Sequence, residues 1–185
     1  MFPEISLHVL DIAQNSIKAG ATRIRIEIAA DTAAKRLLVA VKDNGCGMDS
    51  RQLSQCMDPF FTSRTTRRVG LGIPFLKQSA ECTGGSFWIR SQAGAGTELA
   101  AEYHMGHIDC IPLGDINATM YSLILMNEAI DFYYRYAVDG REFVLDTSKM
   151  RGLLGDMPLG SSEVAAFIRE YLEENKREAD QEEIL

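Results

Sequence analysis

Hydrophobic and polar positions follow two different periods in the first forty residues. Between residues 5 and 19, apolar side chains recur every three or four positions, which predicts an amphipathic helix. Gly20 predicts the end of that helix, because glycine readily adopts the left-handed conformation common there. The residues of the predicted buried face are Leu7, Leu10, Ala13 and Ile17.

Strict alternation of apolar and polar residues follows this helix at residues 23–28. Residues 23–28 predict a half-buried strand, residues 31–35 a polar turn, and residues 36–42 a second strand. Asp43 therefore stands where the second strand ends.

The last eighty residues predict a smaller unit, after a connector at 109–115. Asp139 and Gly140 separate two apolar runs, and this dipeptide is a strong hairpin signal. Residues 152–160 are predicted to be a loop, and the acidic stretch from Glu173 to Glu183 is predicted to fray. The predicted elements are a helix at 116–129, strands at 130–138 and 141–145, and a final helix from Glu163 to about Arg177. Alternation is expected to place two aromatic residues on each face of the first strand, from the set Phe132, Tyr133, Tyr134 and Tyr136.

Three polar residues share one stripe of the first predicted helix. Asp11 and Asn15 are four positions apart, and Lys18 follows three positions later. An amide oxygen suits Mg²⁺, which takes one or two protein ligands besides phosphate oxygens and water. The carboxylate is a candidate general base, and the lysine is a candidate phosphate contact. The alternative is the solvated face of an ordinary amphipathic helix.

The segment from Asp43 to Met48 reads Asp-Asn-Gly-Cys-Gly-Met. Gly45 and Gly47 allow a sharp turn and close approach of a flat ligand. A carboxylate at the end of the strand can accept a hydrogen bond from an exocyclic amine, which distinguishes adenine from guanine. The alternative is a simple turn, because Asp-Asn-Gly is common turn chemistry.

A basic and aromatic segment follows between Asp58 and Pro74. Phe60 and Phe61 are candidate loop anchors, and the arginines and hydroxyls beyond them suit phosphate. Gly70 and Gly72 precede a predicted helix in which Pro74 fits the first turn. Free amides at the start of a helix form an anion site.

These motifs resemble the ATP-binding domain of the GHKL superfamily, which includes DNA gyrase, the heat-shock chaperone ATPase, histidine kinases and the mismatch-repair protein MutL. The run from Asp11 to Met48 is most similar to the MutL branch, and the run from Asp58 to Thr97 looks like a histidine kinase. The resemblance covers about Ile5 to Tyr103. It implies an α+β fold, a two-layer α/β sandwich of the Bergerat type, with a mixed, mostly antiparallel sheet and helices on one face. We expect residues 1–105 to form this domain and residues 106–185 a small α-β-β-α extension.

By this resemblance, Asn15 would ligate Mg²⁺ and Asp43 would bind the adenine amine. Residues Thr62 to Gly72 would form a lid over the phosphates. The residues expected to contact ATP are Asn15, Asp43, Gly45, Gly47, Met48, Phe61, Thr62, Gly70, Leu71, Gly72 and Thr97.

Two departures from the family pattern stand out. The residue four positions before the asparagine is a glutamate in the hydrolytic branches, whereas here it is the shorter Asp11. A histidine kinase also needs a dimerising helical hairpin that carries an acceptor histidine, and this chain has no room for one before Asn15. His8 lies in the asparagine helix itself and is expected to be a packed or capping residue. We therefore expect any acceptor to belong to another chain.

Charge and composition limit the kinds of partner that we expect this protein to bind. The formal charge of -7 over 185 residues argues against general affinity for nucleic acids. No apolar run reaches the length needed to span a bilayer, so we expect a cytoplasmic protein without membrane attachment. The spacing of the four cysteines does not suggest a metal site, and His104 and His107 are expected to be an exposed pair.

Two kinds of function remain open on the sequence. One is an enzyme that uses Mg-ATP, either a slow ATPase or a protein kinase acting on a separate partner. The other is a non-catalytic, nucleotide-gated binding module of the anti-sigma-factor type. The C-terminal extension is either a structural addition to the sheet or a surface for a partner or a second copy.

Overall fold

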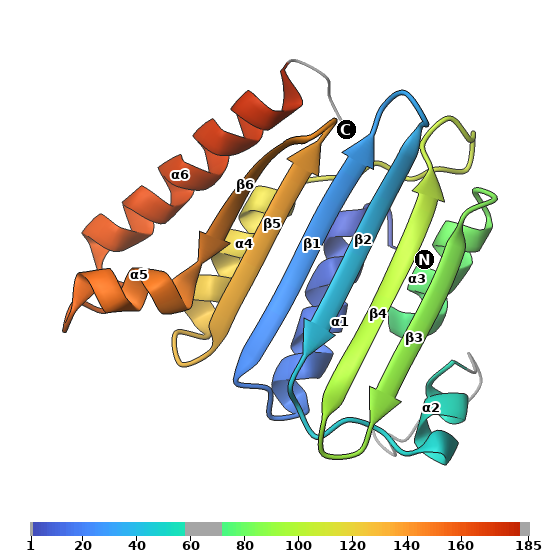
Figure 1. Ribbon diagram of the computed structural model, residues 1–185, viewed down its shortest axis with the longest axis horizontal. Helices are drawn as coiled ribbons and strands as arrows, with labels where there is room; N and C mark the ends of the chain where they lie inside the picture. The colour runs from blue at the N-terminus through green and yellow to red at the C-terminus, as the bar shows by residue number, and fades with distance from the viewer. Residues whose placement is uncertain (1, 58–71, 182–185) are drawn as a thin grey trace.

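All strands that the structure describes belong to one sheet. The computed structural model describes residues 2–57 and 72–181. The strand order is β3-β4-β2-β1-β5-β6 (Figure 1), and neighbouring strands are antiparallel except β1 and β5, which are parallel. The strands are β1 (Arg23–Asp31), β2 (Arg36–Asp43), β3 (Ser86–Gln92), β4 (Gly96–His104), β5 (Asp131–Val138) and β6 (Arg141–Asp146).

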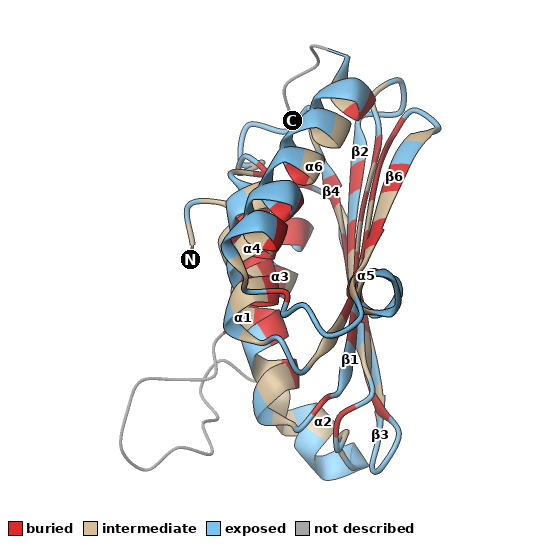
Figure 2. Ribbon diagram, turned by 90° about the vertical axis from the view of Figure 1, so that its left-hand side faces the viewer, coloured by how far each residue is buried: buried red, intermediate tan, exposed pale blue. Residues whose placement is uncertain are grey.

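Helices α1, α3, α4 and α6 form a layer on one face of this sheet, and the opposite face is largely open (Figure 2). This arrangement confirms the predicted α+β fold with a mixed, mostly antiparallel sheet and helices on one face. The helices are α1 (Ile5–Lys18), α2 (Ser50–Cys56), α3 (Gly72–Glu81), α4 (Ile116–Met126), α5 (Thr147–Leu154) and α6 (Ser162–Asp180).

The core lies between the sheet and the helix layer. Ile24, Ile26 and Ile28 of β1 are fully buried, as the alternation at 23–28 predicts. Leu37, Val39 and Val41 of β2 are buried as well. Because successive side chains of a strand point to opposite faces, the residues between them are directed to the open face.

The predicted buried face of α1 is only partly confirmed, since Leu10 and Ile17 pack against the core without being fully buried. Only Ala13 is buried, whereas Leu10 and Ile17 are partly exposed. The face that contacts the core consists of Ile5, Val9, Ile12, Ala13 and Ser16. Leu10 and Ile17 pack against the edge of the core and also line a groove between α1 and α4. Two apolar stripes therefore share this helix, because it packs against both the sheet and a neighbouring helix.

The C-terminal segment extends the same sheet. β5 pairs in parallel with β1, and β6 pairs with β5 through a tight hairpin. Asp139 and Gly140 have φ values of 50° and 83°, the positive values that a two-residue hairpin turn requires, so the predicted hairpin is confirmed. The division into units of 1–105 and 106–185 stays a prediction, since the sheet runs across that boundary.

The expected distribution of aromatic residues on β5 is wrong. Phe132, Tyr134 and Tyr136 all face the helices and are buried, and only Tyr133 lies on the other face. The three even-numbered positions share one face of a strand, because the side-chain period is two. Most of this aromatic cluster is thus core.

Two helices were not predicted. α5 occupies part of the segment expected to be a loop, and its N-terminus is capped by Asp146, which accepts hydrogen bonds from the amides of Ser148 and Lys149. α2 begins with a capping box made by Asp49 and Gln52. In the sequence, both helices are marked only by short polar capping patterns and not by a long repeat of apolar residues, so they were missed.

The acidic C-terminal stretch stays helical up to Asp180, farther than predicted. Tyr136 donates a hydrogen bond to the carboxylate of Asp180 at 2.7 Å, and Arg141 donates to the carbonyl of Ala179 at 2.8 Å. These contacts hold the end of α6 on the sheet, so the local charge does not decide where the helix ends.

His8 is fully buried in α1, as expected for a packed residue. Neither ring nitrogen has a hydrogen-bond partner among the described residues, and the ring meets Phe2 edge-on, with 5.0 Å between centroids. Burial lowers the pKa of His8 from 6.5 to about 4. The folded protein therefore holds this imidazole neutral.

This buried histidine predicts an acid-sensitive fold. Below about pH 6.5 the unfolded chain binds a proton on His8 that the folded chain binds only near pH 4. We therefore expect this residue to reduce the free energy of unfolding by about 2–3 kcal/mol as the pH falls across that window. Urea unfolding between pH 7 and 4 should show a smaller loss in His8→Leu than in the wild type. The same substitution at exposed His104 should leave the profile unchanged, and an equal loss in all three proteins would contradict the prediction.

Candidate functional site

The carboxylate of Asp43 is held on the helix side of the sheet where β2 ends. Ser16 of α1 donates a hydrogen bond to Oδ2 at 2.6 Å. The main-chain amides of Gly45 and Thr97 donate to Oδ1 at 2.9 Å and 3.2 Å. Among the described residues Ser16 is the only partner of Oδ2, which leaves that oxygen with an acceptor site for a ligand.

Three glycines allow the chain around Asp43 to pass close to itself. A Cβ on Gly47 would lie 1.9 Å from the carbonyl oxygen of Gln92, and one on Gly96 would lie 2.0 Å from that of Asp43. Gly47 and Gly96 also have positive φ values of 63° and 99°. A Cβ on Gly45 would lie 2.9 Å from Ala19. The glycine pattern is therefore explained by chain-to-chain contact at the β2, β3 and β4 ends.

Ser91 connects these segments and was not singled out by the sequence. Its hydroxyl accepts a hydrogen bond from the amide of Met48 at 2.8 Å and donates one to the carbonyl of Gly96 at 3.0 Å. Its oxygen also lies 2.8 Å from Oγ1 of Thr97. Alternation along β3 places Ser91 on the helix side of the sheet, with Asp43. Ser16 was given no role either, although it directly follows Asn15 in the motif of the first helix.

The three polar residues predicted to share one stripe of α1 have different surroundings in the structure. Asn15 is partly exposed, and its side-chain amide has no hydrogen-bond partner in the part of the chain that the structure describes. Asp11 lies against the start of α3, since a Cβ on Gly72 would be 1.8 Å from Oδ2 of Asp11. Lys18 is exposed and lines the groove between α1 and α4.

Several predicted residues lie outside the described ranges. They are Phe61, Thr62, Gly70 and Leu71, which belong to the predicted lid. Gly72 is the first described residue after this gap, and Pro74 lies in the first turn of α3, as predicted.

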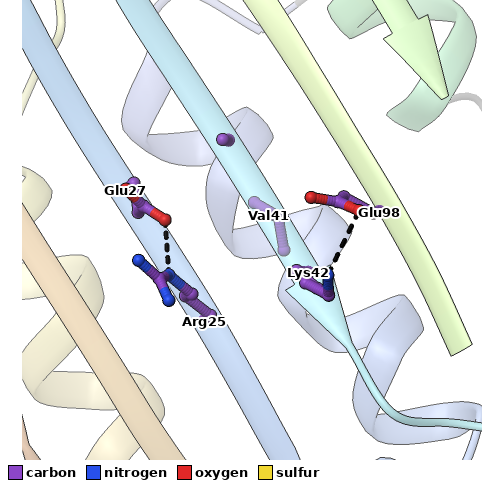
Figure 3. Close-up of a pocket in the computed structure, with 6 residues that line it drawn as sticks. Arg25, Glu27, Val41, Lys42 and Glu98 are labelled. Carbon is purple, nitrogen blue, oxygen red and sulfur yellow. Dashed lines mark hydrogen bonds and ion pairs between the residues drawn. The ribbon is translucent and has the colours of Figure 1, made fainter. Parts of the chain in front are cut away.

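A separate hollow of about 260 Å³ lies on the open face of the sheet (Figure 3). Arg25 pairs with Glu27 along β1, and Lys42 lies 3.3 Å from Glu98 across β2 and β4. Lys42 and Asp43 are consecutive and point to opposite faces, so this hollow is not continuous with the Asp43 site. Its charges are already paired, which makes it the weaker candidate for a ligand site.

The described residues include no cluster of three or more metal-ligating side chains. Within residues 2–57 and 72–181, none of the helices combines the length and the apolar character that crossing a bilayer requires.

Comparison with known families identifies the class. Residues 4–106 match the family model of histidine kinase-, DNA gyrase B- and HSP90-like ATPases. This match covers more than half of the chain, and the protein belongs to that family. The GHKL resemblance of the sequence motifs is thereby confirmed.

Curated relatives are sensor and sporulation kinases. The chain is 37% identical over 89 residues to sensor protein kinase FleS of Pseudomonas aeruginosa, an alignment that covers 48% of this chain and 22% of the relative. It is 30% identical over 91 residues to sporulation kinase D of Bacillus subtilis, covering 49% of this chain and 18% of the relative. The chain thus spans about a fifth of the length of these relatives.

Solved structures show the same fold. The ATPase domain of Aquifex aeolicus MutL complexed with ADP aligns over 100% of both chains with a TM-score of 0.51 and 15% identity. The N-terminal domain of a DNA repair protein aligns over 78% of this chain and 53% of that chain with a TM-score of 0.56 and 15% identity.

Proposed function

We propose that this protein binds Mg-ATP between α1, α3 and the end of β2. The observation that carries the proposal is the Asp43 carboxylate, which three hydrogen bonds hold in place while Oδ2 keeps an acceptor site. An adenine amine is a donor that fits this site. Family membership supports the same ligand.

The residues on α1 suit the phosphate end of the nucleotide. Asn15 would hold Mg²⁺ through its amide oxygen, and one such ligand is enough for a metal that keeps phosphate and water oxygens. When bound, the metal would neutralise charge on the phosphates. Asp11 is the candidate base, and its carboxylate lies beside Gly72 at the start of α3.

We further propose that ATP is used slowly, by hydrolysis or by phosphoryl transfer to a separate protein. Two of the three histidines of the chain, His104 and His107, stand at or beyond the end of β4. β4 pairs with β2 so that His104 is opposite Arg36, seven residues from Asp43. At about 3.3 Å per residue, this separation is roughly 23 Å. His8 is fully buried. An acceptor on a separate chain fits this arrangement better than one of these histidines.

The second candidate is a nucleotide-gated binding module with little or no turnover. The shorter side chain at Asp11 favours it, because a general base must reach its proton directly or through one water. A role of residues 106–185 as a partner or dimer surface remains a proposal. The burial of Phe132, Tyr134 and Tyr136 supports a structural role for most of that segment.

Phosphate release and self-labelling from saturating Mg-ATP test these alternatives. We expect slow release in the wild type and a loss of about 100-fold or more in Asp11→Asn, the usual effect of removing a general base. The dissociation constant of ATP should change little, since asparagine has nearly the same shape. Glu81→Gln, at the other end of α3, is the matched control. Equal turnover in wild type and Asp11→Asn would contradict the assignment of the base, and tight binding without turnover in either would favour the gated module.

A further inference from the structure

The hydrogen-bond network around Ser91 has one consistent assignment of protons. An amide can only donate, so Ser91 accepts from Met48. A carbonyl can only accept, so the single hydroxyl proton of Ser91 goes to Gly96. The contact of 2.8 Å to Oγ1 of Thr97 allows either oxygen to donate, and the assignment that satisfies all three hydrogen bonds makes the threonine the donor. Ser91 is fully used by these three bonds.

This assignment determines what Thr97 can offer a ligand. Its hydroxyl proton is committed to Ser91, so its oxygen has only lone pairs left. Thr97 is partly exposed, and its own amide donates to the carboxylate of Asp43, which places the two residues side by side. Asp43 is likewise an acceptor. Two adjacent side chains therefore present acceptors, and no hydroxyl proton, at this end of the site.

We propose that Ser91 is a positioning residue that sets base specificity by holding the Thr97 hydroxyl as an acceptor. The inference rests on the proposed binding of ATP at Asp43. A pocket end with two acceptors favours a purine that carries an amine at position 6, and disfavours one with a carbonyl oxygen there. Without Ser91, the Thr97 hydroxyl is free to rotate and donate to such a carbonyl.

The test compares the dissociation constants of ATP and inosine triphosphate, which differ at position 6 of the purine. The readout is their ratio, measured by calorimetry in wild type, Ser91→Ala, Ser91→Thr and Thr97→Val. We expect Ser91→Ala to reduce the preference for ATP by about three- to tenfold, the range for one uncharged hydrogen bond. Ser91→Thr keeps a hydroxyl and should restore the preference. Ser86→Ala, at the exposed start of β3, is the control and should match the wild type.

Several outcomes would overturn the inference. An unchanged ratio in Ser91→Ala would do so, and so would equal weakening of both nucleotides, which would mean that Ser91 only supports the loop. If Ser91→Ala does not fold, Ser91→Cys carries the same expectation, because its thiol has a similar shape and is a weak acceptor for the Thr97 hydroxyl. A wild type that binds neither nucleotide would contradict the proposed function itself, whereas tight ATP binding with an unaltered ratio would contradict only the role of Ser91.

Discussion

Replacing Asp43 with asparagine is expected to weaken ATP binding by about 1.5–3 kcal/mol, or roughly ten- to hundredfold, the typical contribution of a hydrogen bond to a charged group. Oδ1 of Asp43 accepts from two main-chain amides, so the amide oxygen of an asparagine would occupy that position. Its NH₂ group would then replace Oδ2 and face Ser16 and the adenine amine. The NH₂ group and the adenine amine are both donors, so the hydrogen bond that Oδ2 of Asp43 accepts in the wild type could not form.

The fold should survive this change. Ser16 can accept a hydrogen bond from the new NH₂ group, because a hydroxyl both donates and accepts. Calorimetric titration with ATP measures the effect, and the thermal midpoint reports the fold. Asp156→Asn, which alters an exposed carboxylate in the loop after α5, is the matched control. An unaltered dissociation constant in Asp43→Asn would show that the base binds elsewhere.

The second large effect is expected for Gly47→Ala. The added Cβ would lie 1.9 Å from the main-chain oxygen of Gln92, a distance that requires the backbone to move. The positive φ of 63° adds a penalty of about 1–2 kcal/mol for an L-residue. With the steric cost included, we expect the free energy of unfolding to fall by about 2–5 kcal/mol and ATP binding to be severely weakened.

Gly94 in the neighbouring hairpin supplies a control for the steric part. Its φ is +80°, yet a Cβ there would meet nothing within 4 Å. In Gly94→Ala, the free energy of unfolding should therefore fall only by the backbone penalty, about 1–2 kcal/mol. Denaturant unfolding of both variants separates the two contributions. Equal losses in the two proteins would mean that the close approach of residues 47 and 92 does not constrain the fold.

The strands of the N-terminal half could be predicted from local pattern. Alternation at 23–28 specified which residues of β1 face the core, because the period of two is a property of the extended chain itself. The same rule, applied to residues 132, 134 and 136, would have placed all three on one face. The continuous apolar run at 37–41 predicted β2 as a strand without specifying which of its residues face the core. Motif order identified the family, since Asp43 and the glycines near it have a spacing that is uncommon by chance.

The face of α1 could not be read in the same way. Leu10 and Ile17 and the set of Ile5, Val9 and Ile12 form two stripes on one helix, and the sequence does not say which stripe meets the sheet. That choice depends on α4, which is about a hundred residues away in the chain. The length of α6 depends in the same way on Tyr136 and Arg141.

The sequence by itself determined the family, the types of the main elements and the position of Asp43 at a strand end. These properties depend on neighbours in the chain and on backbone geometry. Only the tertiary structure decided that Ser16 and Ser91 support Asp43 and Thr97, and that β5 extends the sheet beside β1. The reason is physical: a hydrogen bond such as Ser16 to Asp43 joins residues 27 positions apart, and only the folded chain brings them within 2.6 Å.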